Sequence, residues 1–311
     1  MKHNTKANMA SWSLIAAMMV ACLMAGLGMN FAIGPASSVA PLIVLTLLWI
    51  ALVIGERTDR PRLALGATAF LQMTLFTIIG VVLAYILAAR AGPLWDDPFT
   101  AADAFIGLNW PAIFRVADSM PIALWAGGIA YHSLTLQMIV CIVVLSITDQ
   151  REALQLAVLA AVVSGFLTIA ISGLMPAMGN VFDPINYRHL WPSVAWMEQD
   201  LISGLRSGSN RILDLSHLMG IVTFPSYHAT LPVILAWAQR DVRRWRVIAP
   251  LWGGVTILAT PLFGGHYGID VIAGLMLAIL GIATARLVAM NNSPTPLFSR
   301  LRGQRHRVGR T

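Results

Sequence analysis

The sequence offers a candidate catalytic set of two histidines and an aspartate, which stand at the ends of apolar runs. His266 and Asp270 are four residues apart at the start of one run, so on a helix they share one face. A carboxylate bonded to one imidazole nitrogen fixes the tautomer and leaves the other nitrogen free as a nucleophile or a base. His228 stands at the start of another run, just after Ser226, which is placed to cap that helix or to donate to an anion.

The two histidines together indicate more than either does alone. Alone, a histidine in the place of His228 is more often structural, and the His266–Asp270 pair is equally compatible with pinning a helix end. Two apolar segments joined by the basic turn 240–246 separate the motifs, so both histidines are predicted at the same membrane face. One histidine can attack phosphorus while the other protonates the leaving oxygen, and arginines can hold the remaining oxygens. The pattern therefore favours phosphoryl transfer.

The composition predicts the elements that must position these residues. Of 311 residues, 57% are hydrophobic and only 11% are charged, whereas an ordinary soluble domain has about 25% charged residues. Long apolar runs, without alternating strands of about ten residues, predict an all-α polytopic transmembrane helical bundle rather than a β-barrel. We expect about eight spans, over residues 12–33, 40–54, 63–89, 133–147, 153–175, 226–239, 247–263 and 267–290.

Two polar stretches interrupt the apolar runs. Residues 90–132 are too polar to cross a membrane, and we expect them to lie along its surface as an amphipathic segment. Residues 176–220 form a long loop, and long loops are often functional. We expect the catalytic core in the last three spans and this preceding outer loop. The predicted units are N-terminal helices with the surface segment (1–132), a phosphatase-like membrane core (133–290) and a basic cytoplasmic tail (291–311).

The basic residues predict the orientation. With eight spans, 16 lysines and arginines, including the tail, fall on the side of the termini and five fall on the other side. Basic residues favour the cytoplasm, so we expect cytoplasmic termini in a cell (inner) membrane and a site at the outer, periplasmic face. Because the basic residues follow membrane topology, the net charge of +7 does not indicate nucleic-acid binding. Cys22 and Cys141 lie within apolar runs and predict neither a disulfide framework nor a metal site.

The motifs resemble those of the type 2 phosphatidic acid phosphatase superfamily of membrane lipid phosphatases and phosphotransferases. Pro225-Ser226-Tyr227-His228 is similar to the family's second motif, Pro-Ser-Gly-His, and His266-Tyr267-Gly268-Ile269-Asp270 is similar to the end of its third, His-x-x-x-Asp. The combination of the motifs Phe-Pro-Ser-x-His and Gly-Gly-His-Tyr-x-x-Asp resembles the branch that includes inositol phosphorylceramide synthases. The resemblance covers about the last third of the chain, and the first half matches only as generic membrane helices.

The resemblance implies a role for each matching residue. His266 would be the nucleophile that forms a phosphohistidine, and Asp270 would orient it. His228 would protonate the leaving group and later activate the water or alcohol acceptor. Ser226 and Tyr227 would contact the phosphate. The resemblance also implies a reaction without a metal ion, and we expect no cofactor.

The chain departs from the family pattern in its phosphate-binding cations. The first motif, Lys-x6-Arg-Pro, is missing, Thr260 stands where the third motif has arginine, and Tyr227 replaces the glycine of the second motif. Arg206 and Arg211, in the long loop, are the best substitutes by position, with lipid headgroups or loop salt bridges as their alternative roles. Arg188 is a weaker candidate.

We therefore expect an integral membrane enzyme that cleaves a phosphoester or pyrophosphate of a membrane lipid. One alternative is a phosphotransferase that passes the group to an alcohol. Another is a lipid transporter or a silent lipid binder, which the missing cations favour and the paired histidines disfavour. Haem ligation is a third, disfavoured because His266 is already committed to Asp270. The expected partners are a lipid phosphate substrate and the bilayer, and the sequence predicts no protein partner and no nucleic acid.

Overall fold

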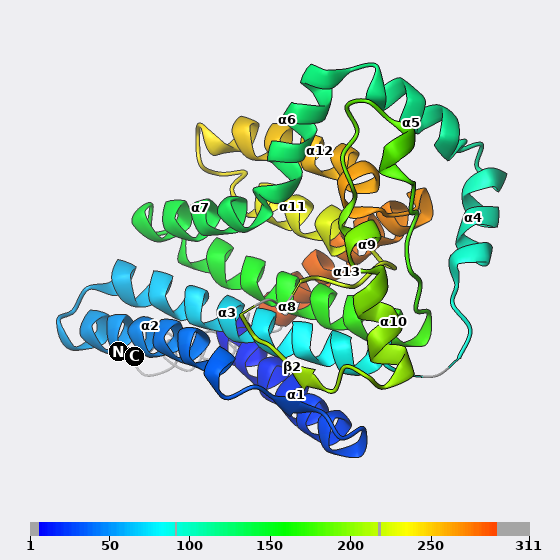
Figure 1. The fold of residues 1–311 in the computed structure, drawn as a ribbon. Coiled ribbons are helices and arrows are strands. Elements are labelled where there is room, and N and C mark those ends of the chain that lie inside the picture. The colour runs from blue at the N-terminus through cyan, green and yellow to red at the C-terminus, as the bar shows by residue number, and fades with distance from the viewer. Residues whose placement is uncertain (1–5, 91, 217–218, 291–311) are drawn as a thin grey trace, which may run out of the picture.

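The computed structural model describes residues 6–90, 92–216 and 219–290, and its regular structure is almost entirely helical (Figure 1). The expected tail 291–311 lies outside the described residues. The α-helices are α1 (Lys6–Gly28), α2 (Val39–Arg57), α3 (Pro61–Ala88), α4 (Asp96–Phe105), α5 (Trp110–Asp118), α6 (Pro121–His132), α7 (Leu134–Ile147), α8 (Arg151–Leu174), α9 (Val194–Met197), α10 (Gln199–Ser207), α11 (Tyr227–Ala238), α12 (Trp245–Gly264) and α13 (Gly268–Met290). Two short 3-10 turns (Ala36–Ser38 and Pro184–Asn186) and a parallel pair of two-residue strands, β1 (Ala32–Ile33) and β2 (Ile212–Leu213), complete the described structure.

The predicted all-α polytopic bundle is confirmed. In the described part of the chain, six helices are long and apolar enough to cross a membrane: α1, α2 with the turn before it, α3, α8, α12 and α13. The pair α6 and α7 gives a seventh if it counts as one broken span, bent by 56°. The 12 residues of α11 are fewer than the roughly 20 that a full crossing needs, so eight spans stays a prediction.

The expected surface segment 90–132 is only partly amphipathic in the structure. α4 and α5 are short amphipathic helices, as predicted. Residues 121–132, however, form the apolar helix α6, which packs against α12 and joins α7 at Ser133. The apolar segment that leads into α7 therefore begins about three turns earlier than the sequence predicted.

α8 is the central helix of the bundle. It packs against α1, α3, α11 and α13, and two thirds of its apolar window is buried. Gly281 of α13 permits a close approach to α8, because a Cβ there would lie 2.7 Å from the carbonyl oxygen of Ala160. By contrast, α2 is 6% buried over its apolar window and presents most of its surface outward, as expected of a helix in lipid.

The two ends of the bundle differ in character. The basic turns after α2, α7 and α11 lie at the end where α1 begins, and the long loop with α9 and α10 covers the opposite end (Figure 1). α11 runs from the loop end to the basic end with 12 residues, about 18 Å, whereas α8 has 24, about 36 Å. The start of α11 therefore lies about halfway along α8, where the Tyr227 hydroxyl donates to the carbonyl oxygen of Ala161 (3.0 Å).

Candidate functional site

His266 lies in the short turn between α12 and α13, and its side chain is buried. The preceding Gly265 has φ +73°, a left-handed conformation that glycine adopts at low cost, and Gly264 passes close under the imidazole ring. His266 Nδ1 lies 2.8 Å from the carbonyl oxygen of Thr223. A carbonyl oxygen only accepts hydrogen bonds, so Nδ1 carries the proton and Nε2 keeps its lone pair. This is the tautomer that a nucleophilic histidine needs.

Asp270 joins the two motifs. It is fully buried in the first turn of α13, and its Oδ2 lies 3.3 Å from His266 Nδ1 and accepts the Tyr267 N–H at 2.8 Å. Its backbone carbonyl accepts the N–H of Ser226 at 3.0 Å. The same residue therefore holds His266 in place and fixes the entry of α11, which carries His228.

His228 lies in the first turn of α11 and stacks on Tyr131 of α6, with ring centroids 4.3 Å apart and an angle of 16° between the planes. His228 and His266 line one cavity at the loop end of α11, together with Tyr131, Glu198 and Gly264. Its free volume is about 20 Å³, roughly one water molecule. The structure thus brings together the three residues of the predicted catalytic set.

The two residues between the motif proline and His228 have other partners. The Ser226 hydroxyl accepts the N–H of Ala229 (3.3 Å) as the N-cap of α11. The Tyr227 hydroxyl is bonded to Ala161, and its ring lies against Phe76 of α3 (6.0 Å between centroids). Neither side chain lines the histidine cavity, so their expected contact with phosphate is not supported by this arrangement.

The two substitute arginines also lie elsewhere. Arg206 donates to the carbonyl oxygens of Arg90 (3.1 Å) and Gly92, and so ties α10 to the segment after α3. The guanidinium of Arg211 lies over the ring of Phe31, 4.7 Å from its centroid. None of the described residues that line the histidine cavity is an arginine or a lysine. Both arginines therefore have other contacts in this structure, and their replacement of the missing cations stays a prediction. Arg188 does not line the cavity either, and its backbone N–H donates to Asp118.

Glu198 is the residue of the cavity that the sequence did not reveal as functional. It lies between α9 and α10, is 3% exposed, and its Oε1 has no hydrogen-bond partner among the described residues. Burial raises the pKa of Glu198 to about 8, so at neutral pH this carboxyl group carries a proton. A protonated carboxyl donates a hydrogen bond, as a phosphate oxygen requires. Its only sequence signal was its place in a long loop.

Three aspartates of α4 and α5 hold the backbone around the site. Asp96 accepts the N–H groups of Met178 and Gly179 and the hydroxyl of Tyr267. Asp103 accepts the first two N–H groups of α13, Gly268 at 2.7 Å and Ile269 at 2.8 Å, together with the indole N–H of Trp110. Asp118 accepts three consecutive loop N–H groups, those of Arg188, His189 and Leu190, and these bonds lower its pKa. The segment expected to rest on the membrane therefore also fixes the site.

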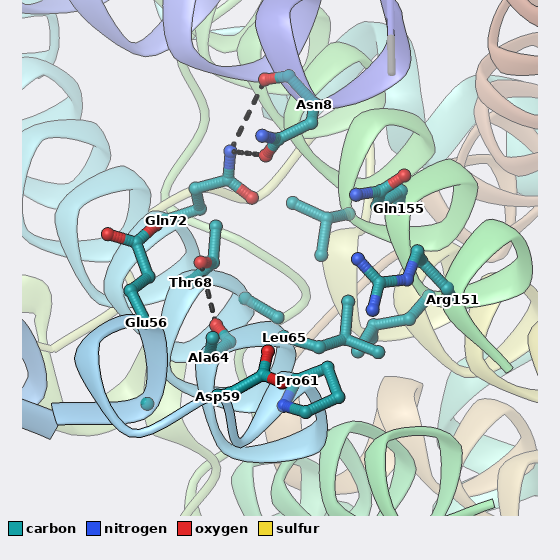
Figure 2. A pocket seen from close by; sticks show the side chains of 14 residues that line it. Asn8, Glu56, Asp59, Pro61, Ala64, Leu65, Thr68, Gln72, Arg151 and Gln155 are labelled. Atoms are coloured by element: carbon teal, nitrogen blue, oxygen red, sulfur yellow. Dashed lines mark hydrogen bonds between the residues drawn. The ribbon is translucent and has the colours of Figure 1, made fainter. Parts of the chain in front are cut away.

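A larger cavity, of about 800 Å³, lies toward the basic end between α1, α2, α3 and α8 (Figure 2). Arg151 faces Glu56 and Asp59 across it, and Gln72 donates to Asn8 (2.9 Å) at its wall. Its described lining holds no histidine, so it offers no pair of imidazoles for phosphoryl transfer. This cavity is the larger of the two, but the histidine cavity has the residues that phosphoryl transfer requires, so we take it as the candidate functional site.

Comparisons with known proteins identify the family of this chain. A family model described as the PAP2 superfamily matches residues 97–284, which extend from the start of α4 into α13. The matched region thus contains both histidines, Glu198, Asp103 and Asp118, and Asp96 lies one residue before it. Comparisons with curated proteins and with solved structures gave no match.

Proposed function

Because the chain belongs to the PAP2 superfamily, whose members carry out phosphatase-type phosphoryl transfer, we propose that it is a membrane phosphatase acting on a lipid phosphomonoester or pyrophosphate. The observation that carries the proposal is the environment of His266. Its Nδ1–H is held by the Thr223 carbonyl, which leaves Nε2 unprotonated beside His228 in a shared cavity. A purely structural histidine does not need a second histidine in the same cavity.

The proposed reaction has two steps. His266 Nε2 attacks phosphorus, the bond from phosphorus to the lipid oxygen breaks, and His228, protonated once the anionic phosphate lies beside it, gives its proton to that oxygen. Water then attacks the phosphohistidine, His228 accepts a proton from it, and the P–N bond breaks to release inorganic phosphate. Protonated Glu198 donates to a phosphate oxygen in both steps, where the family uses cations.

The membrane setting supports a lipid as the substrate. The histidines lie about halfway along a bundle of apolar helices, at a depth where lipid chains are the natural solvent. A phosphotransferase would share the first step and would use an alcohol in place of water in the second step. The lack of a cation among the described cavity residues favours the second alternative, a silent lipid binder.

The decisive experiment is phosphate release by purified protein in nanodiscs, with chelator, from phosphatidic acid, phosphatidylglycerol phosphate and a polyprenyl pyrophosphate. We expect release by wild type and a loss of about three orders of magnitude or more in His266→Ala. His189→Ala, which changes an exposed histidine of the same loop, is the matched control and should behave as wild type. An acid-labile phosphoprotein that forms in wild type and not in His266→Ala would identify the intermediate.

Each alternative has its own outcome. Transfer to an added alcohol without release to water would replace the phosphatase proposal by a phosphotransferase. Saturable lipid phosphate binding, with neither release nor transfer by folded wild type, would leave a non-catalytic binder.

A further inference from the structure

We propose that an apolar slot between α3 and α8 binds the hydrocarbon chain of the substrate next to its leaving oxygen. The slot has a volume of about 150 Å³, and His228 is one of the residues that line it. It shares His228 and the segment 220–222 with the histidine cavity, so the two spaces adjoin. This inference rests on the proposed function, and it adds the location and the chemistry of the substrate's lipid part.

The position of His228 decides which part of the substrate the slot receives. In the proposed reaction His228 protonates the leaving oxygen, which is the oxygen that remains on the lipid. In a phosphomonoester of a hydrocarbon alcohol, the carbon chain attached to that oxygen therefore starts beside His228. The described structure offers an apolar space there, on the side away from His266 and Glu198, neither of which lines it.

The walls of the slot suit an alkyl chain. Phe76, Val81 and Ala84 of α3 face Ile169 of α8, and no charged residue is present among the described residues that line it. Tyr227 also lines the slot, but its hydroxyl is already bonded to Ala161. A volume of 150 Å³ is about seven times that of the histidine cavity, which holds roughly one water molecule, and so is comparable to a short run of methylenes. A charged headgroup would lose its hydration without gaining a partner there.

Two features make the slot particular to this chain. α3 lies outside the matched residues 97–284, so one wall comes from the N-terminal helices. Tyr227, which stands where the related motif has glycine, places its ring against Phe76 and so bounds the slot. Thr77 at its rim is exposed on the bundle surface, so the slot opens sideways between helices, where a lipid chain can enter from the bilayer.

The test uses soluble alkyl phosphates of two, four, six and eight carbons, with protein in nanodiscs of zwitterionic lipid. In wild type we expect kcat/KM to rise at least about tenfold from ethyl to hexyl phosphate, because each buried methylene adds to binding. Ala84→Phe fills the slot and should reduce this hexyl-to-ethyl ratio to about one, with Ala84→Leu intermediate. Ala40→Phe, the same change on an exposed residue of α2, should keep the wild-type ratio.

The ratio is internal to each variant, so a partial loss of folded protein does not affect it. The same series is also measured as Kd for His266→Ala, alone and combined with Ala84→Phe, which needs no turnover. A chain-length dependence of Kd that Ala84→Phe removes would support the slot even if wild type released no phosphate and the proposed function failed. A ratio near one in wild type, or one that Ala84→Phe and Ala84→Leu leave unchanged, in both kcat/KM and Kd, would overturn the slot.

Discussion

At the scale of single residues, a backbone carbonyl, more than the carboxylate, sets the tautomer of His266. The Thr223 oxygen is the nearer partner of Nδ1, at 2.8 Å against 3.3 Å for Asp270 Oδ2. A carbonyl does not titrate in the physiological range, so the nucleophilic nitrogen stays available whatever the charge of Asp270. The carboxylate is left to stabilise the positive charge that develops on the ring when Nε2 bonds to phosphorus.

The pH dependence of Glu198 gives a prediction at this scale. The carboxyl group donates to phosphate only when protonated, and burial raises its pKa to about 8. We expect phosphate release by wild type to fall as the pH rises through about 8, whereas Glu198→Gln, which keeps an N–H donor, should hold its rate to pH 9. A pH–rate profile of both proteins measures this, with Glu152→Gln, an exposed glutamate at the first turn of α8, as control. An identical alkaline decline in Glu198→Gln would refute the role.

The same group predicts the pH dependence of stability. The folded protein holds the Glu198 proton between the ordinary pKa of 4.5 and about 8, and the unfolded chain does not. The free energy of unfolding contributed by this group therefore falls as the pH rises across that window. Glu198→Gln should show a smaller drop in Tm between pH 6 and pH 9 than wild type, measured by thermal unfolding in the same detergent.

At the scale of elements, α4 and α5 hold the turn between α12 and α13, which carries His266. The carboxylate of Asp103 is 1% exposed and caps α13 two residues before Asp270, while Asp96 holds both the loop and Tyr267. Such bonds from a carboxylate to backbone N–H groups are strong and directional. The positions of His266 and Asp270 thus depend on helices that contribute no described residue to the histidine cavity.

Asp103→Ala tests whether these hydrogen bonds position the site. Loss of three accepted hydrogen bonds should lower the free energy of unfolding by about 2 kcal/mol or more and reduce kcat more than it raises KM. Asp103→Asn keeps one acceptor oxygen and should recover part of both. Asp97→Ala, an exposed aspartate of the same helix, serves as the control in both assays. If kcat stays unchanged while stability falls, Asp103 supports the fold but does not position the site.

The sequence predicted the helices better than their breaks. Composition and apolar runs were enough for the long spans, because burial in lipid leaves few other solutions. The bend at Ser133 was not visible, since residues 121–132 follow a polar stretch and carry the small residues Gly127 and Gly128. The sequence did indicate that α11 is short, because only 12 residues separate the polar residues Ser226 and Gln239.

The residues of the site were predictable to different degrees. His228, His266 and Asp270 follow from local spacing, and the structure brings them together. Glu198, Arg206 and Tyr227 depend on contacts between segments far apart in the sequence, such as Tyr227 with α8, and no spacing rule encodes those. A side chain of the right type near a motif, like Arg206, is therefore weak evidence of a shared site.

At the scale of the whole molecule, we propose that the basic end of the bundle faces the cytoplasm and the long loop faces outward. The turns after α2, α7 and α11 carry arginines and gather at one end (Figure 1). An excess of arginine and lysine in short loops marks the cytoplasmic side. The histidine cavity would then be reached from the outer half of the membrane.

Single cysteines test this orientation. In intact cells, a membrane-impermeant maleimide should label Asn186→Cys in the loop, and should label Thr58→Cys after α2 only once the membrane is permeabilised. Both positions are exposed, and the natural cysteines Cys22 and Cys141 are buried. Labelling of Thr58→Cys alone in intact cells would show the reverse orientation, and labelling of both would show that the two ends are not separated by the bilayer.

Because α11 is only half as long as α8, the proposed active site lies inside the bundle, and the membrane potential should affect substrate binding there. With this orientation, a phosphate that reaches His266 from outside moves some way through the electric field of the membrane, toward a negative interior. Each elementary charge that crosses 100 mV changes its free energy by about 2.3 kcal/mol. A phosphate dianion that crosses about half of a 100 mV potential meets an opposing energy of about 2.3 kcal/mol, a roughly fiftyfold weaker apparent affinity. An energised membrane would restrain such an enzyme, and depolarisation would release it.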